Sequence, residues 1–193
     1  MQQHMQQDKH QIEDIMRIFD DCFAESYNTR LERGGDYPIY LPQFADEDGV
    51  PSDRPYNVIL FAHGFYSSAL HEISHWLVAG TERRKLEDFG YWYEPDGRSA
   101  QRQREFESVE VKPQAIEWVL ATAAGFRYFA SADNLTGNAG DNSAFKHAVY
   151  EQVKIYAERG FLPKRAEQLR QALCQFYGTP TQIDLSQFDI ARI

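Results

Sequence analysis

Residues 67–80 read SSALHEISHWLVAG and predict a short helix with an apolar face. His71 and His75 are four positions apart, so their imidazoles lie one above the other on one side of that helix. Two imidazoles so placed can bind one metal ion, and Glu72 completes a His-Glu-x-x-His motif. The alternative, two ordinary core or surface histidines, fits less well because two histidines beside a glutamate make poor core material. The sequence therefore predicts a metal site on this helix.

The residues around the motif define the ends of the helix and what precedes it. Ser67 or Ser68 is suited to cap the N-terminus, and Gly80 is suited to end the helix. Residues 58–62 form a compact apolar run with strand composition. We expect a buried strand that leads directly into the motif helix.

Apolar periodicity predicts the remaining elements. Further helices are expected at about residues 8–32, 99–107, 113–125, 143–159 and 163–177, and short strands at residues 39–41 and 89–93. The residue before Pro113 is biased away from helix, so either one helix kinks there or a new one begins with Pro113 in its first turn. Residues 1–9 are Gln-rich and predict a loose end. Residues 10–193 predict a single metalloenzyme domain of the α+β class, mostly helical with a small sheet and a zincin-like helix that carries the motif.

Composition narrows the classes of function. The net charge of −9 argues against stable binding to nucleic acid or to a membrane surface. No apolar run approaches the roughly 18 residues that span a bilayer and no signal peptide opens the sequence, so we expect a cytoplasmic protein. Cys22 and Cys174 lie within apolar helical patterns and are expected to be buried free thiols.

Positive charge is concentrated after the motif helix. Six of the twenty Lys and Arg residues fall between Arg83 and Arg104. Such a run is usually a solvated surface. The alternative is a basic patch that receives an acidic partner.

A site with two histidines needs at least a third protein ligand. The other histidines considered are His10, His63 and His147, but carboxylates before a long apolar helix are better placed. We expect Glu110 to be the third ligand and Gln114, one turn further on, to support it. Glu107 is the alternative ligand or supporting residue, and a solvent-exposed face is the alternative for the whole group.

Ligand types alone leave the chemistry open. Two histidines and a glutamate serve zinc hydrolases such as metallopeptidases, in which Glu72 would be the general base. The same set forms the facial triad of non-haem Fe(II) oxygenases. A metal-dependent endoribonuclease is a further alternative. A purely structural zinc module is disfavoured because the motif lacks the four-ligand closure of such sites.

Several strings resemble the elongation factor P hydroxylase family. They are residues 63–66 (HGFY), 69–76 (ALHEISHW), 88–93 (DFGYWY), 95–98 (PDGR), 106–115 (FESVEVKPQA) and 133–135 (DNL). The resemblance extends from about residue 10 to the last helix. It implies a cytosolic bacterial enzyme, on a fold unlike the jelly-roll hydroxylases and closer to the endoribonucleases of rRNA maturation.

The resemblance also implies a chemistry. The substrate would be the β-lysylated lysine of elongation factor P, hydroxylated with Fe(II) as cofactor and O₂ as co-substrate, although zinc can occupy such a site in vitro. His71, His75 and a glutamate within residues 106–110 would hold the iron. Glu72 would then be a supporting or proton-handling catalytic residue rather than a hydrolytic base.

A long cationic substrate arm suggests an aromatic-lined entry. Tyr66, Tyr91 and Trp92 are candidates for packing against the arm, although they could equally be ordinary core residues. Arg98, within the basic run, is a candidate for contact with the acidic translation factor.

Overall fold

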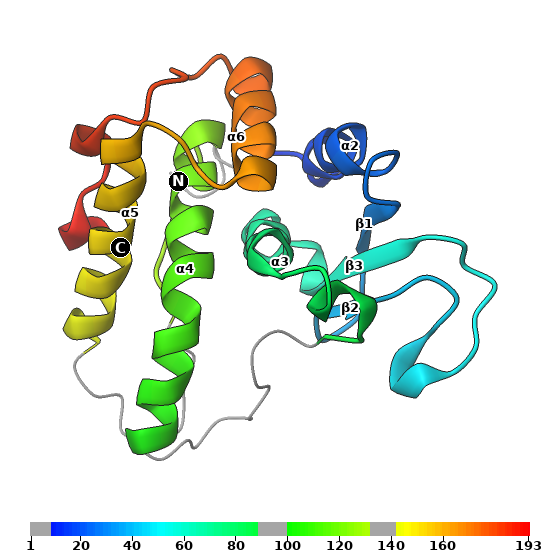
Figure 1. The fold of residues 1–193 in the computed structure, drawn as a ribbon. Coiled ribbons are helices and arrows are strands. Elements are labelled where there is room, and N and C mark those ends of the chain that lie inside the picture. Colours follow the sequence, from blue (N-terminus) through cyan, green and yellow to red (C-terminus); the bar gives the residue numbers. More distant parts are fainter. Residues whose placement is uncertain (1–8, 89–99, 132–141) are drawn as a thin grey trace.

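The computed structural model describes residues 9–88, 100–131 and 142–193 (Figure 1). The helices are α2 (Ile12–Phe23), α3 (Tyr66–Val78), α4 (Ala100–Ala124), α5 (Ser143–Arg159) and α6 (Lys164–Tyr177), and the strands are β1 (Thr29–Arg33), β2 (Ile39–Leu41) and β3 (Asn57–Phe61). The predicted α+β class, mostly helical with a small sheet, is confirmed.

The sheet is small and mixed. Its strand order is β1-β3-β2, with β1 parallel and β2 antiparallel to β3. Leu31 in β1 lies opposite Ile59 in β3, and both are almost completely buried. The strand predicted at residues 58–62 is thus the centre of the sheet, and a single 3-10 turn, Ala62–Gly64, connects it to α3. This connection fixes where the motif helix starts.

Helix α4 is the longest element and organises the helical part. It packs against α3, α5 and α6 (Figure 1). Pro113 lies inside it, so the two alternatives for this segment resolve to one continuous helix. Continuity matters because it places residues before and after Pro113 on a common face.

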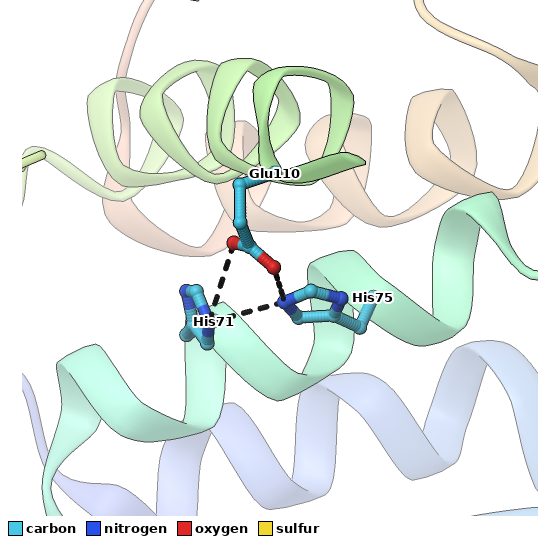
Figure 2. Close-up of side chains that lie close together, drawn as sticks. All are labelled: His71, His75 and Glu110. Atoms are coloured by element: carbon cyan, nitrogen blue, oxygen red, sulfur yellow. Dashed lines mark hydrogen bonds and ion pairs between the residues drawn. The ribbon is translucent and has the colours of Figure 1, made fainter. Parts of the chain in front are cut away.

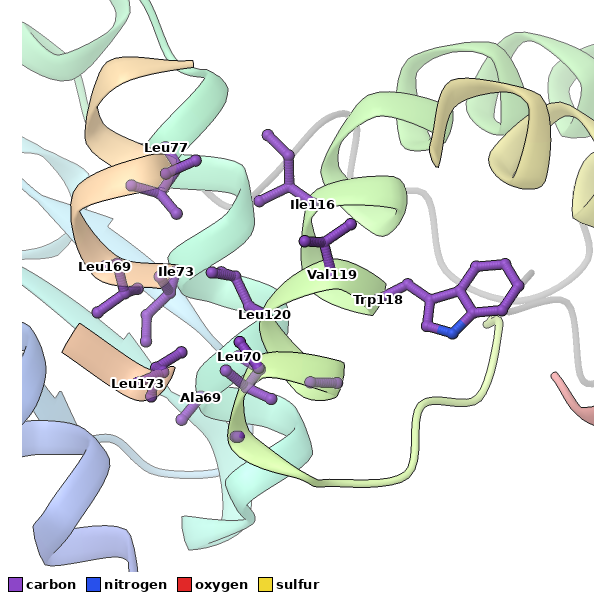
Figure 3. Packing of buried hydrophobic residues seen from close by; sticks show 14 of the residues in the cluster. Ala69, Leu70, Ile73, Leu77, Ile116, Trp118, Val119, Leu120, Leu169 and Leu173 are labelled. Carbon is purple, nitrogen blue, oxygen red and sulfur yellow. The ribbon is translucent and has the colours of Figure 1, made fainter. Parts of the chain in front are cut away.

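The core joins α3, α4 and α6. Ala69, Leu70 and Ile73 of α3 pack among apolar side chains of the two other helices, Ile116, Val119 and Leu120 of α4 and Leu169 and Leu173 of α6 (Figure 3). All of these side chains are almost completely buried. Close packing holds side chains in defined rotamers, so the opposite face of α3 has a fixed orientation.

The prediction of one helix over residues 8–32 is wrong. Helix α2 ends at Phe23, and Thr29–Arg33 form strand β1. The carboxylate of Asp20 accepts a hydrogen bond from the Leu31 amide at 3.1 Å, and Asn28 adopts a left-handed backbone with φ of 48°. Pairing with β3, which is distant in sequence, therefore overrides the local helical pattern.

The predicted start of the motif helix is wrong, whereas its predicted end is right in position but not in mechanism. The helix begins at Tyr66 after Phe65, with no side-chain cap. Ala79 is the C-terminal cap, so Gly80 follows it as predicted, but Gly80 does not adopt the left-handed conformation. Arg165 donates to the carbonyl oxygens of Leu77 at 3.1 Å and Ala79 at 2.6 Å. A side chain from α6 thus satisfies the last turn, which glycine would otherwise end by backbone geometry.

The C-terminal helices agree closely with their predicted ranges. Gly160 and Gly178 follow α5 and α6 with φ of 76° and 68°, the left-handed conformation that ends a helix. Both thiols are free; Cys174 is buried as predicted, whereas Cys22, also expected to be buried, is only half-buried. The strand predicted at residues 89–93 lies outside the described residues. None of the helices in the described ranges combines the length and hydropathy required to cross a membrane.

Candidate metal centre

Helix α3 presents both histidines toward α4 (Figure 2). The Nε2 atoms of His71 and His75 lie 3.1 Å apart. His75 is 9% exposed, whereas the side chain of His71 remains 26% exposed. One ligand position is therefore enclosed and the other borders open space.

Glu110 reaches the histidines from α4 (Figure 2). Its Oε1 lies 3.3 Å from His75 Nε2, and its Oε2 lies 3.9 Å from His71 Nε2. The side chain is almost completely buried. Burial favours the neutral carboxyl, but the charge and hydrogen bond of His75, with His71 and Gln114, outweigh it and hold the pKa of Glu110 well below its usual range.

The donor set fits a divalent transition metal. His71, His75 and Glu110 each offer one ligand atom, and these atoms lie within 4.8 Å of one another. Nitrogen ligands at about 2.1 Å from a metal lie about 3 to 3.5 Å apart, which matches the spacing of the two Nε2 atoms. Two imidazoles and one carboxylate on one side of an ion leave positions for other ligands.

Glu117 was not anticipated from the sequence. Its Oε2 lies 2.8 Å from His71 Nδ1, and its side chain is 9% exposed. Burial lowers the pKa of His71, but the Glu117 carboxylate outweighs it, so the net effect raises the pKa. Three side chains share one face of α4 at i, i+4 and i+7: Glu110, Gln114 and Glu117. The sequence would have predicted this shared face if the helix had been expected to continue through Pro113.

Gln114 is tied to both the site and the chain after α4. Its Nε2 donates to Glu110 Oε2 at 3.2 Å and to the Ser131 carbonyl at 2.6 Å. Its Oε1 accepts from the Tyr128 hydroxyl at 2.8 Å and from the Ser131 amide at 3.1 Å. The amide is thereby fixed in orientation and presents a donor to Glu110.

Glu72 does not join the donor group. It lies beside the histidines on the wall of a cavity of about 950 Å³ that also exposes His71 and Glu117. Burial raises the pKa of Glu72, and the nearby histidines oppose this effect. The cavity connects His71 with the outside of the molecule, since its lining includes the exposed side chains of Phe65 and Phe129.

The other predicted residues lie elsewhere. Glu107 accepts a hydrogen bond from Gln103 at 3.0 Å and is not part of the donor group. His10 contacts the carbonyl of Ala124, and His147 that of Ser143. His63 sits in the turn before α3.

Of the four residues predicted to bind substrate, Tyr66 is the one that lies within the described residues. Tyr66 lines the cavity but is 6% exposed, and its hydroxyl donates to that of Tyr177 at 3.0 Å. Tyr91, Trp92 and Arg98 lie outside the described residues and stay predictions.

Two cations of the basic run are already engaged. Arg83 forms an ion pair with Asp88. Arg84 lies over the rings of Tyr27 and Trp76 and donates to the Ala79 carbonyl at 3.0 Å. Arg84 thus stabilises the end of α3, and both contacts reduce the charge that the run can offer to a partner.

Comparison with known proteins places this chain in a family. The family model described as elongation factor P hydroxylase matches residues 18–188. The chain is similar to the elongation factor P lysine hydroxylase of Haemophilus influenzae, with 69% identity over 185 residues that cover 96% of this chain and 99% of the relative. The chain therefore belongs to the elongation factor P hydroxylase family.

Proposed function

We propose that this protein is a cytoplasmic Fe(II)-dependent enzyme that hydroxylates the β-lysylated lysine of elongation factor P. The observation that carries the proposal is the group of His71, His75 and Glu110 beside an open cavity, in a chain of this family. The relative's name supplies the substrate protein and the reaction. The donor set and the hydroxylation together favour iron, because the non-haem Fe(II) oxygenases combine two imidazoles and one carboxylate with oxygen insertion.

The residues of the chain have distinct tasks in this reaction. Bound at these ligands, Fe(II) would supply the redox chemistry that activates O₂ for insertion into a C–H bond. Glu117 holds the Nδ1 side of His71, so that Nε2 faces His75 and Glu110. Gln114 holds the Glu110 carboxylate in place. The cavity admits the substrate side chain next to His71.

Metal replacement tests this function. Protein stripped of metal and reloaded without oxygen should hydroxylate lysylated elongation factor P when supplied with Fe(II), O₂ and a reductant such as ascorbate. The factor should gain the mass of one oxygen atom. The zinc-loaded protein should be inactive in the same assay. Cleavage of lysylated elongation factor P by the zinc-loaded protein without O₂ would contradict the proposal and favour hydrolytic chemistry.

A further inference from the structure

We propose that Glu72 receives the ammonium group of the substrate's lysine-derived arm inside the cavity. This proposal rests on the proposed function and adds a recognition residue to it. The sequence suggested a proton-handling role for Glu72. The surroundings of its carboxylate favour recognition of a cation.

The cavity is lined by both apolar and charged side chains. Phe65, Ser68 and Glu72 lie at i, i+3 and i+7 and line it together along one side of α3 and the residue before it. Phe65 is 57% exposed, and Phe129 from the segment after α4 is 56% exposed. Glu72 is only partly exposed. An arm that lies along this side of α3 therefore runs from the exposed Phe65 ring toward a carboxylate.

The other carboxylates in and beside the cavity already have hydrogen-bond or ion-pair partners. Glu13 forms an ion pair with Arg33. Glu117 contacts His71 at 2.8 Å, and Glu110 contacts His75 at 3.3 Å. Within residues 9–88, 100–131 and 142–193, by contrast, Glu72 makes neither a hydrogen bond nor an ion pair.

The cations in the cavity wall are not placed to serve Glu72. Arg33 is the partner of Glu13. The guanidinium of Arg127 lies over the ring of Phe129, 4.5 Å from its centroid. Among the carboxylates of the described residues in and beside the cavity, Glu72 is therefore the one whose oxygens can accept hydrogen bonds from a ligand.

An uncompensated carboxylate that is partly withdrawn from water carries a desolvation cost. A primary ammonium removes this cost, because it brings three donors and the opposite charge. The aliphatic stem of such an arm can pack against Phe65 and Phe129, whose rings are more than half exposed. Because Glu72 is adjacent to His71 in α3, an ammonium held there keeps the neighbouring carbons close to the metal ligands.

This assignment makes a different kinetic prediction from a proton-handling role. Loss of an ammonium-binding carboxylate weakens substrate binding, whereas loss of a proton-handling group slows the chemical step. We expect Glu72→Gln to raise KM for lysylated elongation factor P about 10- to 100-fold, with kcat changed less than about threefold. Metal content should equal that of the wild type, because Glu72 is not in the donor group.

A binding measurement tests the assignment without turnover. n-Pentylamine and n-pentanol have the same chain length and differ at neutral pH in the charged end. The metal-loaded wild-type protein should bind the amine at least about tenfold more tightly than the alcohol, as measured by calorimetry. Glu72→Gln should lose this preference, and Glu72→Asp, which keeps the charge, should retain part of it.

The control is Glu151→Gln. It makes the same change in net charge on α5, where Glu151 pairs with Lys154 on the surface. This variant should keep the amine preference and the wild-type KM. The proposal is overturned if Glu72→Gln keeps the preference, or if its defect falls on kcat alone. An inactive wild type that still prefers the amine would refute the proposed function but support the cation site.

Discussion

The hydrogen bond between Glu117 and His71 selects the ring nitrogen that faces the site. With Nδ1 engaged at 2.8 Å, Nε2 is the atom directed to His75 and Glu110. Partners of this kind typically contribute 10- to 100-fold to metal affinity. We expect Glu117→Ala to weaken Fe(II) or Co(II) binding by about this factor and Glu117→Gln by less. Anaerobic titration of the Co(II) absorption bands measures it.

The exposed residue Glu105 on the same helix supplies the control for this prediction. Its side chain is 56% exposed and is not in the donor group. Glu105→Ala should leave Co(II) affinity unchanged. Equal affinities for the Glu117 variants and the wild type would show that the hydrogen bond does not orient His71.

A second prediction at this scale separates the two glutamates that the sequence offered as ligands. Glu110→Ala should abolish stoichiometric metal binding, because it removes the carboxylate that contacts both histidines. Glu107→Ala should leave binding within about twofold, since Glu107 interacts with Gln103 instead. Metal analysis after gel filtration distinguishes the two. Metal loss in the Glu107 variant with retention in the Glu110 variant would reverse the assignment.

Spacing alone brings His71 and His75 together, because four residues along a helix fix their relative positions. Glu110 lies near the histidines because of how α4 packs against α3. The sequence does not show this packing, so it offers Glu110 only as one of several candidate carboxylates. Glu117 was missed for a physical reason. With the helix interrupted at Pro113, Glu117 has no fixed relation to Glu110; with the helix continuous, the two share a face.

At the scale of elements, α6 is anchored by a partly buried ion pair. Arg170 is 3% exposed and donates to Glu167 at 2.6 and 2.9 Å and to the Thr181 carbonyl at 2.7 Å. Glu167 also accepts from the Leu162 amide at 3.0 Å. The pair therefore ties the turn before α6 to the chain after it.

Removing Glu167 should leave the Arg170 charge buried without its partner. We expect Glu167→Ala to lower the free energy of unfolding by about 2 to 3 kcal/mol, less than a fully buried pair because Glu167 is partly exposed. Urea denaturation followed by circular dichroism measures it. Glu151→Ala is the matched control, since its pair with Lys154 lies on the surface, and it should cost less than about 1 kcal/mol.

The same pair predicts a pH dependence. Burial raises the pKa of Glu167, but hydrogen bonds from Arg170, Gln171 and the Leu162 amide outweigh it and lower the pKa on folding. The unfolded chain therefore binds more protons, so the contribution is present at neutral pH and is lost as the pH falls below about 4.5. The stability difference between wild type and Glu167→Gln should shrink between pH 6 and pH 3 (roughly the titration range of a carboxyl). A constant difference would contradict this linkage.

Local pattern predicted those elements whose ends are set by local chemistry. Helices α5 and α6 end at left-handed glycines, and their ranges agree with the sequence prediction. Strand β1 was missed because only pairing with the distant β3 makes residues 29–33 extended. The end of α3 lies at the predicted position, but Arg165 from α6, rather than a left-handed glycine, supplies the hydrogen bonds to its last turn. Long-range contacts decide what periodicity leaves open.

At the scale of the molecule, the candidate metal site draws its residues from two parts of the fold. Helix α3 is continuous with the sheet through the turn after β3, and α4 packs against α5 and α6 (Figure 1). His71 and His75 belong to the first part and Glu110 to the second. A metal ion bound by all three would therefore link elements that are otherwise joined by the apolar core.

This arrangement predicts that metal binding stabilises the whole fold. The main core is one cluster with members from α2 through α6, so residues 10–193 should unfold in a single transition. At a free metal concentration of about 100 times Kd, a ligand specific for the folded state adds roughly 2.7 kcal/mol. For a chain of this size that corresponds to a rise in Tm of about 5 to 10 °C.

Scanning calorimetry with Co(II), and with a chelator in its place, should show one peak displaced by this amount. The Glu110→Ala variant should show the peak without the displacement. Two separate peaks, of which metal moves only one, would contradict both the single domain and the link between α3 and α4.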